Sequence, residues 1–192
     1  ILSIMAIWFA QSHDINLQKR KKHIRDLRKL YLDIEKTLLK NDIDKLLTIF
    51  ETQNNCFILG KDKSEAIAQE AALKIKEISY IHAEGYSSSS LKHGPFALLE
   101  KDFPVILVAP ENKYFAKNMN AYEEIKSRYA SIILVTNKDG LKLPNTILVE
   151  KNESYGDLLC IIPLQLLAFK LSIYKGCNAD MPRNLAKVVT VE

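Results

Sequence analysis

The amino-acid sequence predicts an α/β fold, a three-layer sandwich with helices on both faces of a mostly parallel sheet. The expected strands are continuous apolar runs, which is typical of strands buried on both faces. Helical segments lie between most of these runs, and this alternation favours parallel strands joined by helical crossovers. The chain has 192 residues, a length that suits one domain of ordinary size.

The composition excludes several other classes of protein. Hydrophobic residues make up 47% of the chain and charged residues 26%, so a wholly disordered chain, a collagen or a coiled coil is disfavoured. Six glycines are too few to suggest a glycine-rich phosphate loop. The three cysteines are widely spaced and give neither a disulfide framework nor a zinc motif. We therefore expect no metal and a reducing, cytoplasmic location.

The first fifty residues predict helices that precede the sheet. Residues 1–11 are apolar, residues 17–39 are amphipathic, and a third helix capped at Asn41 or Asp42 should end near Phe50. The apolar segment is far shorter than the ~20 residues that span a bilayer, so we expect no membrane association. It reads instead as a buried helix that the chain enters part-way.

Strands and helices then alternate to the end of the chain. In sheets of this kind ligands bind beyond the carboxyl ends of the strands, which indicates the loops after Gly60, Ala109 and Thr136. The expected strands are 56–60, 103–109, 132–136 and 146–149, and the expected helices between and after them are 64–80, 113–129 and 155–175.

A cluster of basic residues occupies positions 19–29. A nucleic-acid patch is conceivable there. The cluster is more typical of the solvated face of an amphipathic helix, because apolar residues recur at helical spacing in the same segment. No base-stacking motif accompanies the charge, so we expect no nucleic-acid partner.

Glu70, Lys74 and Glu77 lie on one face of the helix expected over 64–80. Two carboxylates beside an ammonium could hold one carboxylate ready as a proton-transfer base. Glutamate four residues before lysine is also a common exposed ion pair. Spacing alone favours the exposed pair.

Two further residues could carry chemistry. His93 precedes Gly94-Pro95, which places it at a turn where an imidazole could transfer protons to and from sugar hydroxyls, although a lone histidine is more often structural. Lys187 lies in a tail that is apolar enough to pack. A desolvated lysine can form a Schiff base with a carbonyl. The alternative is a surface lysine whose charged end stays in water.

Four stretches of the chain resemble the C-terminal part of the glucosamine-6-phosphate synthases, the glutamine–fructose-6-phosphate amidotransferases (isomerising). They are residues 70–86, 91–112, 162–176 and 181–192, and they occur in the order found in that family. The resemblance extends from about Asn54 to the last residue. It implies that this chain is the second of two sugar isomerase (SIS) domains, each with a five-stranded parallel sheet.

The resemblance also implies a division of the chain. Residues 1–13 correspond to the last helix of a preceding SIS domain and residues 14–52 to connector helices. Residues 53–176 form the SIS domain itself, and residues 177–192 are a C-terminal active-site tail.

The roles of the family's catalytic groups fall on matching residues. Glu77 matches the base that moves a proton between C1 and C2 of the sugar. His93 matches a histidine that opens the sugar ring in the active site of the partner subunit. Lys187 matches a tail lysine that contacts the open-chain sugar through a Schiff base. The resemblance assigns further substrate contacts to Glu70, Lys74 and Ala186.

The implied reaction converts fructose 6-phosphate and glutamine to glucosamine 6-phosphate and glutamate, with no cofactor in the isomerase step. The resemblance implies a homodimer, with an upstream SIS domain and an upstream glutaminase domain in the same enzyme.

The chain departs from the family at several points. Ser90 stands where the family commonly has glutamate, and residues 61–64 replace an Arg-Gly-Asp-type turn. Neither the sugar-phosphate loops of the first SIS domain nor the glutaminase cysteine has a counterpart here. We therefore expect a portion that is incomplete as an enzyme. The alternative is a non-catalytic SIS module that binds sugar phosphate or regulates.

Overall fold

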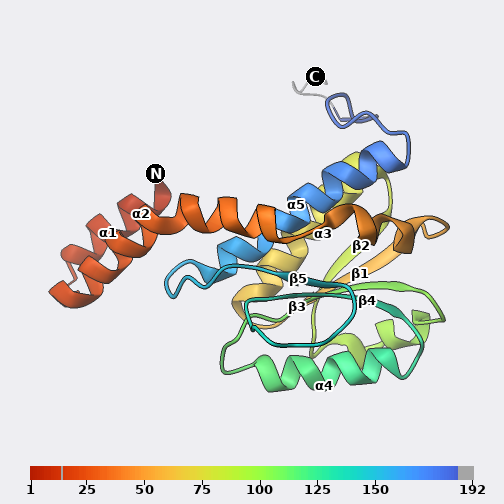
Figure 1. The fold of residues 1–192 in the computed structure, drawn as a ribbon, viewed down its shortest axis with the longest axis horizontal. Coiled ribbons are helices and arrows are strands. Elements are labelled where there is room, and N and C mark those ends of the chain that lie inside the picture. Colours follow the sequence, from red (N-terminus) through yellow and green to blue (C-terminus); the bar gives the residue numbers. More distant parts are fainter. Residues whose placement is uncertain (14, 186–192) are drawn as a thin grey trace, which may run out of the picture.

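The protein folds around a five-stranded sheet in which all strands are parallel (Figure 1). The computed structural model describes residues 1–13 and 15–185. The strand order is β2-β1-β3-β4-β5. The first strand, β1, lies inside the sheet, with β2 on one side of it and β3, β4 and β5 on the other side. The predicted α/β class is confirmed. The strands are β1 (Asn55–Gly60), β2 (His82–Ser87), β3 (Pro104–Val108), β4 (Ser131–Thr136) and β5 (Thr146–Leu148).

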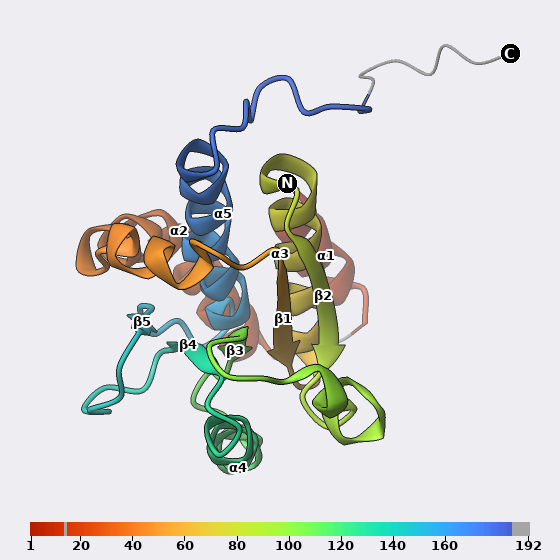
Figure 2. The same cartoon turned by 90° about the vertical axis from the view of Figure 1, so that its right-hand side faces the viewer.

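Helices cover both faces of the sheet and make the three layers (Figures 1 and 2). On one face α3 and α5 pack with η1 in one apolar cluster, which includes Ile58, Ile75 and Leu171. On the other face α4 packs with η2 in a second cluster. The bounds are α3 (Lys63–Ser79), α4 (Phe115–Lys126), α5 (Gly156–Tyr174), η1 (Ile43–Phe50), η2 (Leu91–His93) and η3 (Pro95–Leu98).

Helix α5 is long and apolar enough to span a membrane, with a mean hydropathy of 1.6 over 19 residues. Half of it is buried inside the fold, where it packs against α3. Because the central helix of a layered core has to be apolar on most sides, this composition is typical of a core helix.

Strand β2 is absent from the strands predicted by hydropathy. It lies at one edge of the sheet, and within residues 1–13 and 15–185 it pairs only with β1. Ala83 is its one fully buried residue, and its other side chains are exposed or half-buried. An edge strand of this kind lacks the continuous apolar run that identified the interior strands, although the five strands implied by the family resemblance are all present.

The first helix, α1 (Leu2–Gln11), contains no buried residue, whereas the sequence favours a buried helix there. Trp8 is 61% exposed, and the contacts of α1 are with α2 (Leu17–Lys40). The two helices form a hairpin that projects from one end of the molecule (Figure 1).

Helix α2 is attached to the sheet by polar contacts. All of its buried residues are polar: Asp26, Asp33 and Thr37. The Asn152 side chain donates to an Asp33 carboxylate oxygen at 2.9 Å and to the Asp26 carbonyl at 3.0 Å. The Ser154 hydroxyl donates to Asp26 at 2.7 Å. These bonds fix α2 to the segment that leads into α5.

Asn41 ends α2 and completes the edge of the sheet at β5. Its side-chain amide donates to the Leu148 carbonyl at 3.0 Å, and its amide oxygen accepts from the Leu148 N–H at 2.8 Å. The predicted cap therefore serves the sheet instead of the following helix. That helix, η1, is a 3₁₀ helix with no side-chain cap at Asp42.

Candidate active site

The candidate base and its neighbours lie together on α3. The Lys74 Nζ atom is 2.7 Å from Glu77 Oε2 and 3.9 Å from Glu70 Oε1. The hydrogen bond to Glu77 raises the pKa of Lys74, with the charges of both glutamates acting in the same direction. Lys74 therefore stays protonated at neutral pH, and the stripe predicted from spacing is present in the structure.

This arrangement suits a carboxylate that exchanges protons with a carbon acid. Side chains of Lys74 and Glu77 are 33% and 30% exposed, whereas that of Glu70 is 46% exposed. The pair is therefore accessible to a ligand but better shielded than a surface ion pair. Lys74 places a positive charge beside the carboxyl group that would accept the proton.

Glu77 lies near the amino edge of the sheet. Helix α3 ends at Ser79 and β2 starts at His82, so the last turn of α3 stands beside the first residues of β2. The carboxyl edge, where ligands of parallel sheets usually bind, lies at the other end of α3. The candidate base is thus far from the loops after Gly60, Ala109 and Thr136 that topology indicates.

His93 lies at the opposite edge from Glu77. It is exposed and follows the carboxyl end of β2, a strand of six residues that extends about 17 Å at the usual rise. The neighbouring Leu91 is buried in the cluster on the α4 face, while α3 covers the other face. One chain therefore does not bring His93 and Glu77 together.

The remaining predicted site residues, Ala186 and Lys187, lie outside the described residues. The last described part of the tail approaches the end of α3. The Arg183 N–H donates to the Tyr80 hydroxyl at 2.8 Å. The sequence analysis did not identify Tyr80, because its partner in this contact lies 103 residues away along the chain.

The carboxyl edge of the sheet holds a cavity. Its volume is about 420 Å³, and it opens between the loops after β3 and β4 and the start of α5. Glu111 lies in the lining of this cavity and pairs with Lys138 and Lys151. The hydrogen bonds from these two lysines hold the pKa of Glu111 below its usual value. The balanced charges of this lining do not indicate a particular ligand.

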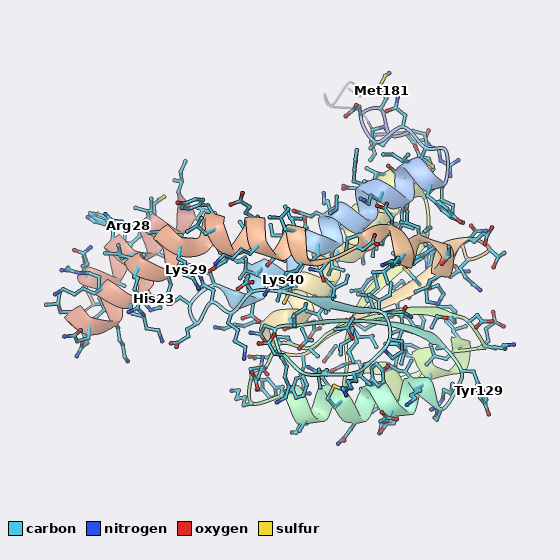
Figure 3. The ribbon with its side chains drawn as sticks, viewed as in Figure 1. His23, Arg28, Lys29, Lys40, Tyr129 and Met181 are labelled. Atoms are coloured by element: carbon cyan, nitrogen blue, oxygen red, sulfur yellow. The ribbon has the colours of Figure 1, made fainter. Side chains whose placement is uncertain are left out.

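No group of three histidine, cysteine, aspartate or glutamate side chains in residues 1–13 and 15–185 is arranged to hold a metal ion. The basic cluster on α2, where Figure 3 labels His23, Arg28 and Lys29, is partly neutralised. Lys29 pairs with Asp33, and Lys22 pairs with Glu153.

Comparison with known proteins identifies the family. Residues 49–173 match the SIS domain. The chain belongs to the SIS domain family. This SIS domain is similar to the C-terminal domain of glucosamine-fructose-6-phosphate aminotransferase from Francisella tularensis, with a TM-score of 0.86 and 31% identity. The similarity covers 94% of this chain and 53% of that structure.

Two curated relatives of this SIS domain share one enzyme name. The chain is 56% identical over 154 residues to a probable glutamine–fructose-6-phosphate aminotransferase (isomerizing) of Acanthamoeba polyphaga mimivirus, covering 79% of the chain and 25% of the relative. It is 38% identical over 204 residues to glutamine–fructose-6-phosphate aminotransferase (isomerizing) 2 of Homo sapiens, covering 100% of the chain and 29% of the relative. The chain thus spans less than a third of either protein.

Proposed function

We propose that this SIS domain is the C-terminal isomerase domain of a glutamine–fructose-6-phosphate aminotransferase (isomerising). Its substrate would be fructose 6-phosphate and its product glucosamine 6-phosphate. The contact between Lys74 and Glu77 carries the proposal, because it places the Glu77 carboxyl group beside an ammonium on α3, at the position expected for the base. The names of the relatives supply the reaction.

In this mechanism the Glu77 carboxylate accepts a proton from one of two adjacent carbons and returns it to the other. The carboxylate is regenerated when the proton reaches the second carbon, so Glu77 neither gains nor loses a proton over the whole step. Lys74 stays charged beside Glu77 and stabilises the carboxylate before and after the transfer. Glu70 adds a polar group for a substrate hydroxyl.

A second copy of the chain would supply the histidine. Because His93 and Glu77 lie at opposite edges of the sheet, they can act on one sugar only if they come from different subunits. His93 would then move a proton from the anomeric hydroxyl to the ring oxygen and so open the sugar ring. This separation supports a homodimer with shared active sites.

The tail would complete the site. We assign Lys187 to the open-chain sugar, where its neutral amine adds to the carbonyl and water leaves to give an imine. Ammonia would then add to this imine and the Lys187 amine would leave, which gives the imine of the sugar with ammonia and frees the lysine. Ala186 would contact the substrate beside it. An upstream SIS domain would bind the phosphate, and an upstream glutaminase domain would release ammonia from glutamine.

The isomerase step as proposed uses only these side chains and needs no cofactor. The three cysteines are free, which supports a reducing, cytoplasmic location.

The test uses a chimaera in which this chain replaces the matched C-terminal quarter of the mimivirus relative. The chimaera should form glucosamine 6-phosphate from fructose 6-phosphate and glutamine. Glu77→Gln should lower that rate at least about a hundredfold, the usual effect of removing a general base. Glu123→Gln is the matched control, because Glu123 is an exposed α4 carboxylate that pairs with Lys126 on the same helix.

Full activity of Glu77→Gln would contradict the role of the base. An inactive, folded chimaera beside an active parent enzyme would contradict catalysis by this chain and favour the second candidate, a non-catalytic SIS module. Ser90 and residues 61–64 are the departures that favour that module. Calorimetry of the isolated chain with fructose 6-phosphate and glucosamine 6-phosphate tests it, and no heat at millimolar ligand would reject it.

A further inference from the structure

The segment that carries His93 is short and mostly exposed. His93 ends η2, a 3₁₀ helix of three residues, and Gly94 separates it from η3. Gly94 has a φ of 145°, in the region that favours glycine, so the chain changes direction directly after His93. The His93 N–H donates to the Ser90 carbonyl at 3.0 Å. An exposed imidazole on so short a turn is placed only as well as the backbone on either side of it.

Helix α4 holds the segment on the amino-terminal side of His93. Leu91 is 1% exposed and packs in the apolar cluster beneath α4. The Lys92 Nζ atom lies 2.7 Å from Glu124 Oε1 of α4. Both side chains of this ion pair are exposed, so the pair adds little to the stability of the whole fold. Its effect is local, because it joins the residue before His93 to the end of α4.

The same end of α4 holds the segment on the carboxyl-terminal side of His93. Phe96 is half-buried and packs against the apolar cluster beneath α4. The Arg128 guanidinium carbon lies 4.0 Å from the centre of the Phe96 ring, within the range of a cation–π contact. The next residue, Ala97, donates its N–H to the Gly94 carbonyl at 2.9 Å. His93 is thus flanked by two contacts with α4, one residue before it and three residues after it.

Glu124 and Arg128 form one unit at the end of α4. The Arg128 Nη1 atom donates to the Glu124 carbonyl at 2.7 Å, and the Arg128 backbone N–H donates to the Ile125 carbonyl at 3.0 Å. The next residue, Tyr129, which Figure 3 labels, accepts from the Asp102 N–H at 2.9 Å. The turn that carries Arg128 is therefore anchored to the loop that leads into β3.

We propose that Glu124 and Arg128 are positioning residues, which hold the backbone on both sides of His93 and thereby fix the place of its imidazole in the active site of a second copy. This inference rests on the proposed function for the role of His93. The two contacts with α4 do not depend on that function. A purely structural pair of contacts would stabilise the fold equally whether or not His93 were present.

The first experiment measures the two contacts in the whole 192-residue chain by amide hydrogen exchange, followed by NMR. Exchange of the Ala97 amide should be roughly two- to tenfold faster in Arg128→Met, because that variant keeps a long side chain and loses the charge over the ring. Exchange of the His93 amide should be faster by a similar factor in Glu124→Gln, which weakens the bond to Lys92.

Glu123→Gln and Lys126→Met are the matched controls for this experiment. These two residues lie at the same end of α4 and pair with each other at 3.6 Å. Both variants should leave the His93 and Ala97 amides unchanged. Unchanged exchange in both Arg128→Met and Glu124→Gln would overturn the proposal, and so would equal acceleration in the two controls.

The second experiment tests positioning in the chimaera by a double-mutant cycle. Arg128→Met should lower kcat for glucosamine 6-phosphate formation roughly tenfold, because small displacements of a proton-transfer group have large effects on rate. It should have no further effect in a His93→Ala background. Equal effects in both backgrounds would show a merely structural role and overturn the proposal.

Failure of the proposed function would give a different result. In that case His93→Ala and Glu77→Gln would both keep full activity, while exchange of the Ala97 amide still depended on Arg128. That outcome would reject a catalytic role for His93, and with it the proposal that Arg128 positions a catalytic group.

Discussion

The amino edge and the carboxyl edge of the sheet differ in the contacts that stabilise them and in the side chains that they expose. At the amino edge the last turn of α3 carries Glu77, and Tyr80 joins it to the tail through an aromatic ring. At the carboxyl edge the loops around Glu111 form a cavity with charged walls, and α2 is tied down by buried hydrogen bonds to Asn152. His93 lies exposed at this second edge.

This difference is the basis for our proposal that the active site is shared between two subunits. A parallel sheet ordinarily gathers ligand-binding loops at its carboxyl edge. Here the best-placed carboxylate lies at the amino edge, and the histidine that would serve the same sugar follows the carboxyl end of β2, a strand about 17 Å long. An active site that needs both groups has to combine two copies of the chain.

Complementation between two inactive chimaeras tests most directly whether the two edges act in different subunits. Glu77→Gln and His93→Ala should each lose at least about a hundredfold in rate. Mixed and allowed to exchange subunits, they should recover about a quarter of the activity, because half of the dimers carry one intact site out of two. Recovery would be measured by glucosamine 6-phosphate formation. No recovery, with subunit exchange confirmed by mass spectrometry, would mean that both groups act within one chain.

Gly60→Ala tests the carboxyl edge alone. A Cβ atom at Gly60 would lie 2.0 Å from the Ser64 carbonyl oxygen, a backbone atom that cannot rotate away. We expect a loss of about 2 kcal/mol in the free energy of unfolding, measured with urea. Gly156→Ala is the control, because its Cβ would meet no atom within 4 Å. Arg183 amide exchange under native conditions should stay unchanged, and a large increase would show that the two edges are coupled.

Lys74→Met tests the electrostatics of the amino edge. The raised pKa of Lys74 means that its charge is present at every pH below its ordinary value of about 10.4, and is lost only as the pH rises through the higher folded value. Without that charge the Glu77 carboxylate loses the cation that contacts it, and the chimaera should form glucosamine 6-phosphate about tenfold more slowly at neutral pH. Lys76→Met, on the same helix, should keep the full rate, and equal losses in both variants would contradict a specific pair.

The smallest expected effect concerns Asp26, which ties α2 to the carboxyl edge. Burial acts to raise the pKa of Asp26, but hydrogen bonds from Ser154 and Arg25 outweigh it and leave the pKa lowered. The stabilisation is therefore complete above the unfolded value of about 3.9 and is lost as the pH falls through the lower folded value. Asp26→Asn should cost about 1 kcal/mol at pH 6 and progressively less below pH 4 in urea unfolding. Asp180→Asn is the control, and a cost independent of pH would contradict this account.

The interior strands and the edge strand β5 could be predicted from the sequence, whereas the edge strand β2 could not. Strands β1, β3 and β4 are apolar runs because both faces of the sheet are covered, and hydropathy alone locates them. Strand β2 is polar because only Ala83 lies deep, so its residues carry no comparable pattern. The burial of polar residues on α2 could not be predicted either, because their hydrogen-bond partners lie more than a hundred residues away in the sequence.

The candidate site was predictable only in part. Helical spacing placed Glu70, Lys74 and Glu77 on one face, and the structure confirms that they are in contact. Spacing could not show that His93 lies at the other edge of the sheet, because that separation depends on the unpredicted strand β2. The contact of Tyr80 with the tail depends on a left-handed backbone conformation that no local pattern signals in a residue other than glycine.

The amide of Asn41 has a consequence for solubility. A primary amide carries the same donor and acceptor as a peptide group, and Asn41 presents them to the outward-facing N–H and carbonyl of Leu148. The outer border of β5 is therefore occupied by a one-residue substitute for a sixth strand. Unpaired borders of sheets are templates for edge-to-edge aggregation. Among the described residues β2 is then the border that stays open, and the Glu84 charge beside the polar His82 side chain makes it a poor template for a further strand.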